Sequence, residues 1–210
     1  MNNQAVSRAL RQTLWPALRQ VGFVTRADRI AWRHDGGHTD LVEVSALGSL
    51  ADSVGATPAS FGAYVGSIPA WFSGRPVPMR KGLPAPHYWH CELQRTLHKT
   101  LSQPWFTPFS RPAAASTPRS FLLHREGLKR VLRRDAHDRL DVWYVQEDGS
   151  NLEEVVQDLL RVVWSVGLPL LDAFHDPAAV VAMAEGGQLN ASSDSFAARD
   201  LVDQARRALD

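Results

Sequence analysis

The sequence predicts a single α+β domain in which an N-terminal helix and C-terminal helices pack on a mainly antiparallel sheet. The apolar spacing is helical over residues 6–21, changes to short β-branched and aromatic runs over residues 23–68, and is helical again after residue 151. Tight turns separate the strand-like runs, which favours antiparallel neighbours. With 44% hydrophobic and 21% charged side chains in 210 residues, the chain can build a sizeable core. We assign residues 1–185 to this domain and residues 186–210 to a linker followed by an amphipathic helix.

The first predicted elements are a helix and a β-meander. Apolar residues recur at three and four positions over residues 6–21, and Pro16 inside this pattern predicts a kink or two short helices near Trp15. The strands expected after this helix cover residues 23–25, 30–32, 41–44 and 60–68.

The segment from His34 to Asp40 contains two histidines and two aspartates around the pair Gly36-Gly37. Such a set resembles a hydrolytic or metal-binding loop. A tight hairpin turn, however, needs Asp-Gly at these positions, and turn chemistry accounts for every residue except the histidines. We therefore predict a hairpin turn here.

The middle of the chain, residues 69–118, is expected to be irregular because nine of the 13 prolines fall there. Within it, Leu93, Leu97 and Leu101 recur at a spacing of four. This spacing predicts a short helix over residues 92–101.

The last third of the chain is predicted to be mainly helical. Alternation predicts a strand over residues 140–145, and a helix then begins at Ser150 or Asn151. Two further helices are expected, one opened by Asp176-Pro177 and one amphipathic helix from Ser195. The first long helix is expected to end at Gly167-Leu168-Pro169, and the second to reach about Glu185.

Charge and cysteine content exclude several classes of protein. The formal net charge is +1, so no whole-protein field attracts the chain to nucleic acid or to an anionic membrane. The single cysteine, Cys91, cannot close a disulfide within the chain. No apolar run is long enough for a membrane span and the N-terminus does not read as a signal peptide. We therefore expect a cytoplasmic protein without a membrane partner.

A family resemblance is carried by seven segments: 18–23, 30–33, 41–44, 61–68, 90–95, 143–144 and 167–170. Among them are the arginine-bearing strand that ends in Arg33, the stretch His90-Cys91-Glu92, and the aromatic pair Trp143-Tyr144. Together these segments resemble the bacterial family known as domain of unknown function 4304, over roughly residues 5 to 183. The resemblance implies a fold and no activity.

Aromatic side chains gather around the proline-rich middle. A rigid segment rich in proline and aromatic residues is typical of a recognition groove, although large aromatic side chains also fill cores. The predicted ligand- or partner-binding residues are Tyr64, Trp71, Phe72, Trp89 and Trp105, with Tyr88 and Phe106 nearby.

Residues 119–139 form a locally basic segment, with seven Lys or Arg against three acidic residues. On a helix, a spacing of four would place the central basic side chains on one face, where they could meet phosphates. The alternative nucleic-acid-binding residues are Lys129, Arg130, Arg133 and Arg134. A solvated helix face explains the same pattern.

Residues 87–98 hold the third candidate site. Imidazole and thiolate are ligands that zinc prefers, and Cys91 next to His90 could also form a nucleophile with its base. The spacing of His87, His90, Cys91 and His98 matches no known metal motif, so we predict no metal, no catalytic residue and no cofactor. The motifs of serine hydrolases, zinc proteases and nucleotide-binding loops are absent from the sequence.

These observations favour a non-catalytic binding or interaction protein, of a regulatory or immunity type, with an unidentified protein partner or small ligand. A homodimer through the C-terminal helix is also compatible with the pattern. The alternative is a nucleic-acid-associated protein that uses residues 119–139. A metal-dependent or thiol hydrolase around His87–His98 is the third hypothesis.

Overall fold

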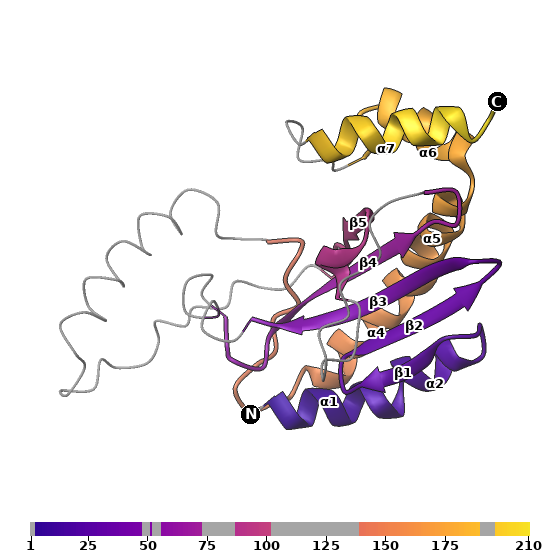
Figure 1. Ribbon diagram of the computed structural model, residues 1–210. Helices are drawn as coiled ribbons and strands as arrows, with labels where there is room; N and C mark the ends of the chain where they lie inside the picture. The colour runs from indigo at the N-terminus through magenta and orange to yellow at the C-terminus, as the bar shows by residue number, and fades with distance from the viewer. Residues whose placement is uncertain (1–2, 48–50, 52–55, 73–86, 102–138, 190–195) are drawn as a thin grey trace, which may run out of the picture.

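The computed structural model describes residues 3–47, 51, 56–72, 87–101, 139–189 and 196–210, and it has the predicted α+β architecture (Figure 1). Five antiparallel strands form one sheet in the order β1-β2-β3-β4-β5. Helices from both ends of the described chain cover one face of this sheet. The strands are β1 (Val24–Ala27), β2 (Ile30–Asp35), β3 (His38–Ala46), β4 (Phe61–Ile68) and β5 (Leu93–Thr96).

The four strands predicted for the meander are confirmed. The β2–β3 hairpin closes with the pair Asp35 and His38, and Gly36 and Gly37 between them have φ values of +54° and +88°. Positive φ at both central residues is the backbone of a type I′ hairpin turn, which side chains other than glycine or asparagine rarely adopt. The hairpin interpretation of residues 34–40 is therefore correct.

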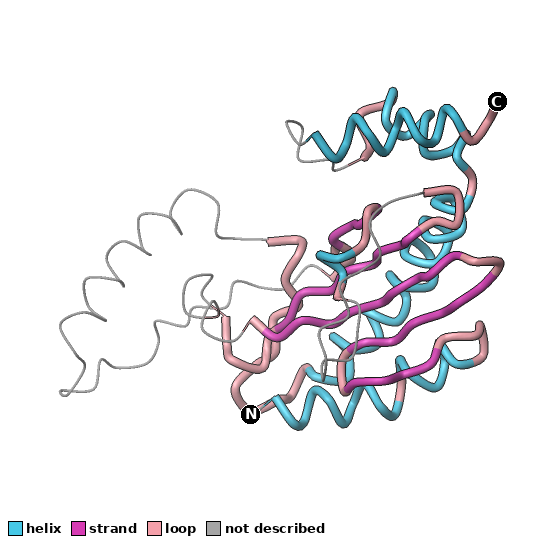
Figure 2. Tube along the Cα trace, in the orientation of Figure 1, coloured by secondary structure: helices cyan, strands magenta, loops and turns pink. Residues whose placement is uncertain are grey.

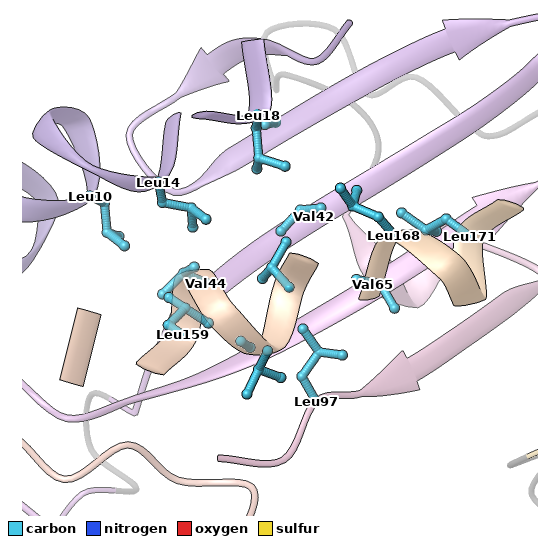
Figure 3. Close-up of a cluster of buried hydrophobic side chains, with 14 of the residues drawn as sticks. Leu10, Leu14, Leu18, Val42, Val44, Val65, Leu97, Leu159, Leu168 and Leu171 are labelled. Carbon is cyan, nitrogen blue, oxygen red and sulfur yellow. The ribbon is translucent and has the colours of Figure 1, made fainter. Parts of the chain in front are cut away.

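Alternation along the strands separates the two faces of the sheet. Val42 and Val44 of β3 and Val65 of β4 point to the helices, where they are fully buried in the main core. Figure 3 shows these side chains facing leucines of the covering helices. The labelled leucines of these helices are Leu10, Leu14, Leu18, Leu159, Leu168 and Leu171, and the labelled Leu97 follows β5.

The N-terminal segment forms two short helices, as predicted: α1 (Asn3–Gln12) and α2 (Leu14–Arg19). The break falls at Thr13. Pro16 lies in the first turn of α2, where a backbone N–H would have no partner within the helix. Trp15 is buried, and its indole N–H donates to the Asp28 carbonyl at 3.1 Å.

The predicted helix over residues 92–101 is wrong, because residues 93–96 form the edge strand β5. Leu93 lies opposite Ser67 in the antiparallel ladder between β4 and β5, and Thr96 lies opposite Tyr64. A spacing of four satisfies the two-residue period of a strand as well as the turn of a helix. Leu93 and Leu97 therefore reach the same core from an extended backbone.

The predicted strand over residues 140–145 is also wrong, since this segment makes only a single antiparallel bridge, between Trp143 and Phe61. Other hydrogen bonds to its backbone come from side chains and from a neighbouring segment: Thr57 Oγ1 donates to the Val145 carbonyl, Asn151 Nδ2 donates to the Tyr144 carbonyl, and the Lys99 N–H donates to the Leu140 carbonyl. The fully buried indole of Trp143 donates to the buried carboxylate of Asp158 at 3.0 Å.

The long helix does not end at residues 167–169 as predicted. It continues as α4 (Leu152–Val162), a π turn η5 (Val163–Gly167) and α5 (Leu168–His175). In the π turn the Leu168 N–H donates to the Val163 carbonyl, five residues back. This wider turn carries the helix past Pro169, whose ring would otherwise clash with the preceding turn.

The last two helices, α6 (Pro177–Glu185) and α7 (Phe196–Arg207), confirm the predicted elements. The Asp176 carboxylate caps α6 by accepting from the Ala178 N–H at 2.9 Å. α7 packs against α6 beyond the end of the sheet, and Leu201 and Ala205 join the main core (Figures 1 and 2).

Within the described part of the chain, no helix taken alone has both the length and the apolar character needed to cross a membrane. Residues 152–175 and 177–185 meet that requirement only as a pair, which is bent by 113°.

Candidate functional site

Two buried carboxylates of β3 organise the two faces of the sheet. Asp40 is 1% exposed and lies on the face covered by helices, whereas Glu43 is 4% exposed and lies on the opposite face. Three positions separate them, and an odd separation along a strand sends side chains to opposite sides. Each carboxylate accepts hydrogen bonds from donors on its own face of the sheet, so the two carboxylates define two separate sites.

The Glu43 carboxylate fixes the turn η3 (Tyr88–His90) against the second face of the sheet. It accepts a hydrogen bond from the Tyr88 N–H at 3.0 Å, and His87 Nδ1 lies 3.2 and 3.3 Å from its two oxygens. His90 Nδ1 accepts from the His87 N–H at 3.0 Å and closes the turn. These bonds hold residues 87–91 in one conformation.

This turn presents the Trp89 indole to solvent. Trp89 is 54% exposed, and its ring stacks on His87 with centroids 4.1 Å apart and planes 6° apart. Tyr88 points the other way and stacks on Tyr64 of β4 at 3.9 Å. Burial, together with Tyr88, raises the pKa of Tyr64 to about 12, so this phenol stays protonated at neutral pH. The Tyr88 ring therefore packs the turn on the sheet, and the Trp89 ring next to it is exposed to solvent.

Gly66 allows the turn to approach the sheet closely. A Cβ at this position would lie 2.7 Å from Cys91 Sγ and 2.8 Å from Cys91 Cβ. Cys91 packs with Ile30 and Leu41 in a small apolar cluster on this face. Any side chain larger than hydrogen at Gly66 would push the turn outward.

The thiol hypothesis finds no support in this geometry. Cys91 is buried, and its thiol points to the His87 carbonyl rather than to an imidazole base. Burial raises the pKa of the Cys91 thiol, and the charges of Glu92, Glu43 and Asp40 raise it further. A buried thiol with a raised pKa is typical of a packing residue.

The histidines that the sequence analysis weighed as candidate metal ligands do not converge. His87 faces Glu43, His90 bonds to the backbone of its own turn, and His98 is exposed. No group of three or more His, Cys, Asp or Glu side chains within the described ranges could hold a metal ion.

The predicted aromatic set divides between the two faces. Tyr64 and Trp89 belong to the site around Glu43. Trp71 and Phe72 pack against the main core instead, and the Trp71 indole donates to the Phe174 carbonyl of α5 at 3.3 Å. Trp105 lies outside the described residues, so the described members do not form one groove.

The second site is a polar row across three strands on the helix-covered face. Arg33 of β2, Asp40 of β3 and Ser67 of β4 are direct neighbours in the ladder. The Arg33 guanidinium donates twice to Asp40 Oδ2, at 2.8 and 3.1 Å, and Ser67 Oγ donates to Oδ1 at 2.8 Å. His175 Nε2, from the end of α5, donates to the same carboxylate at 2.9 Å.

Two more groups join this network. Arg33 also donates to Asp172 Oδ1 at 2.7 Å, so one guanidinium bridges the sheet and α5. The His38 ring stacks on His175 at 3.9 Å, and its Nδ1 accepts from the Ala70 N–H. Burial, followed by the charge of His175, lowers the pKa of His38.

Sequence reasoning missed Asp40 and Glu43 as centres of these sites. One signal was present, because both are ionisable residues inside a strand whose neighbours Leu41, Val42 and Val44 are apolar. Their partners His87 and His175 lie 44 and 135 residues away along the chain. The basic residues of the nucleic-acid hypothesis lie outside the described part of the chain: Lys129, Arg130, Arg133 and Arg134.

Comparisons with protein-family models, with curated proteins and with solved structures found no match to this chain. The resemblance to domain of unknown function 4304 therefore stays a prediction.

Proposed function

We propose that this chain is a cytoplasmic, non-catalytic binding protein, of a regulatory or immunity type, and that it recognises a protein partner through the indole of Trp89. The single observation that carries this proposal is the exposed Trp89 ring, held in place by a turn that a buried carboxylate clamps. Exposed tryptophan is uncommon on the surface of a monomer, and tryptophan is enriched among the residues that contribute most to protein interfaces.

Preorganisation supports the proposal. The His87 stack and the hydrogen bonds to Glu43 fix the turn before a partner arrives, so binding would lose little conformational entropy. Tyr88 and Cys91 bury the underside of the same turn. A rigid aromatic anchor of this kind is typical of a recognition surface, and a loosely held surface tryptophan is not.

The chemistry around Trp89 favours binding over catalysis. His87 is the only imidazole at this turn that touches a carboxylate among the described residues, and the nearby thiol of Cys91 is buried and protonated. A hydrolytic site would need a nucleophile within hydrogen-bond reach of that imidazole.

The experiment is capture of the tagged full-length chain from its own cells at moderate salt, with protein and nucleic acid both analysed. Trp89→Ala is compared with Trp164→Ala, because Trp164 is a second exposed tryptophan, 42% exposed, on the π turn η5. We expect a stoichiometric protein that is retained by the wild type and by Trp164→Ala and lost with Trp89→Ala.

Three outcomes contradict the proposal. A partner retained equally by Trp89→Ala would place recognition elsewhere on the surface. Capture of nucleic acid alone, lost at high salt, would favour the basic residues 129–134. Recovery of no macromolecule with the wild type would remove the interaction function.

A further inference from the structure

A pair of stacked histidines lies at the joint between the sheet layer and the last two helices. His175 is the final residue of α5, and the next residue, Asp176, caps α6. His175 donates to the buried Asp40 carboxylate, and its other contact is the face of the His38 ring, 3.9 Å away and inclined by 19°. Separation of the two rings would therefore weaken the attachment of the end of α5, from which α6 and α7 extend (Figure 1).

We propose that His38 and His175 form a pH-sensitive latch, which holds the end of α5 on the sheet while His38 is neutral and releases it, with α6 and α7, when His38 takes up a proton. This inference is independent of the proposed binding site, which lies on the opposite face of the sheet.

Hydrogen bonding requires His38 to be neutral in the closed state. His38 Nδ1 accepts from the Ala70 N–H at 3.1 Å, so this nitrogen carries no hydrogen. A proton on Nδ1 would turn the acceptor into a donor that faces another donor. The ring would then have to leave Ala70, and with it the stack on His175.

The surrounding charges accommodate one imidazolium but not two. The carboxylates of Asp40 and Asp172 can balance Arg33 and a charged His175, and both already bond to Arg33. A second imidazolium stacked at 3.9 Å would repel the first, since Asp40 and Asp172 already bond to Arg33 and the charge of Asp35 does not outweigh burial and His175. The charged groups around the pair are Asp35 and Asp40 on the hairpin, Arg33 on β2, and Asp172 on α5, while the Asp176 carboxylate is held by the Ala178 N–H.

The direction of the effect follows from His38. Asp35 and Asp40 favour its charged form, but burial and His175 outweigh them and lower its pKa. The released state therefore binds the proton more tightly than the closed state. The latch stabilises the closed state above the ordinary histidine pKa of about 6.5, and it loses this stabilisation as the pH falls from there toward the lower pKa of His38 in the closed state.

The test is amide hydrogen exchange of the full chain, read in peptides that cover residues 168–189 and 196–210. Between about pH 7.5 and about pH 5.5, after correction for the intrinsic pH dependence, we expect exchange in these peptides to rise by about five- to tenfold in the wild type, and about tenfold is the limit that one proton with an ordinary pKa of about 6.5 sets. In His38→Asn the rise should stay below about twofold, because the amide oxygen can accept from Ala70 but cannot be protonated.

His34→Asn is the matched control. His34 lies on the same hairpin, where it contacts Trp32 edge-on and Thr39 Oγ1, away from the stacked pair. This variant should keep the wild-type response.

The proposal is overturned if the wild type shows no rise, or if His38→Asn rises as much as the wild type. Should His38→Asn fail to fold at neutral pH, His175→Gln decides. The side-chain amide of the glutamine can still donate to Asp40, but it cannot carry the positive charge that opposes protonation of His38. It should reduce the response to below about threefold, and an unchanged response would overturn the latch.

Discussion

On the helix-covered face, Asp40 is held by donors from β2, β4 and α5, whereas on the opposite face Glu43 is held by one short turn. The first carboxylate ties together elements that are far apart in the chain. The second clamps a single segment, and the residue next to the clamp is the exposed Trp89. A buried charge that several distant elements contact thus maintains the fold. A buried charge that one short segment contacts fixes that segment on the surface.

The largest expected effect is the loss of stability when Asp40 is removed. Asp40→Ala leaves the Arg33 guanidinium without its buried partner, so we expect the free energy of unfolding to fall by about 3–5 kcal/mol in urea denaturation at neutral pH. Asp172→Ala is the control, because it removes an exposed partner of the same guanidinium and should cost less than about 1 kcal/mol. Equal losses for the two variants would refute the distinction between the buried and the exposed carboxylate.

A methyl group at Gly66 tests the opposite face. Gly66→Ala places a Cβ against Cys91, and we expect overpacking to cost about 1–3 kcal/mol and to lift the turn off the sheet. The sharper readout is the rate at which a thiol reagent labels Cys91 near neutral pH. It should be slow in the wild type, because the thiol is buried with a raised pKa, and faster in Gly66→Ala.

The double variant Gly66→Ala with Cys91→Gly removes both atoms that the new methyl group would meet. Adding Gly66→Ala to Cys91→Gly should therefore lower the free energy of unfolding by less than adding it to the wild type. If Gly66→Ala costs nothing and Cys91 is labelled no faster, the turn is not packed as closely as the structure has it.

Local patterns in the sequence predicted most of the fold. The hairpin at Gly36-Gly37 and the cap at Asp176 depend on neighbouring residues, and both were found. The edge strand was missed because Leu93 and Leu97 fit either period, and only the pairing with β4 decides between them. The extension of α5 past Pro169 depends on a π turn that no local rule predicts.

The candidate sites were harder to predict than the fold. Trp89 was selected for its residue type and neighbours, and the structure places it on the surface. The same reasoning selected Trp71, whose partner Phe174 lies 103 residues away and holds it against the core. Composition shows that aromatic rings are present, but tertiary contacts decide which of them reach solvent.

A smaller effect is expected when the hydroxyl of Tyr64 is removed. Tyr64→Phe loses the hydrogen bond to Tyr88, which should cost about 0.5–1.5 kcal/mol near neutral pH. Because the pKa of Tyr64 is raised to about 12, the folded state holds this proton more tightly than the unfolded state. The stability that it contributes is present below the ordinary tyrosine pKa of about 10 and is lost as the pH rises from there toward 12.

Absorbance titration of tyrosinate checks this prediction. The chain has three tyrosines, and a titration step near pH 12 should disappear in Tyr64→Phe. If that step remains, the stacked pair does not hold the proton on Tyr64, and the anchor beneath Trp89 is weaker than the geometry indicates.

The smallest expected change is in the stability of Trp89→Ala. Because more than half of this side chain is exposed, its removal should alter the free energy of unfolding by no more than about 0.5 kcal/mol. Trp143→Ala provides the contrast, since it removes a fully buried ring of the same type and should cost about 3–5 kcal/mol. Urea denaturation of both variants measures the difference. A loss of several kcal/mol in Trp89→Ala would mean that the ring supports the fold rather than a partner, because an indole kept for recognition is one that the folded chain can lose without unfolding.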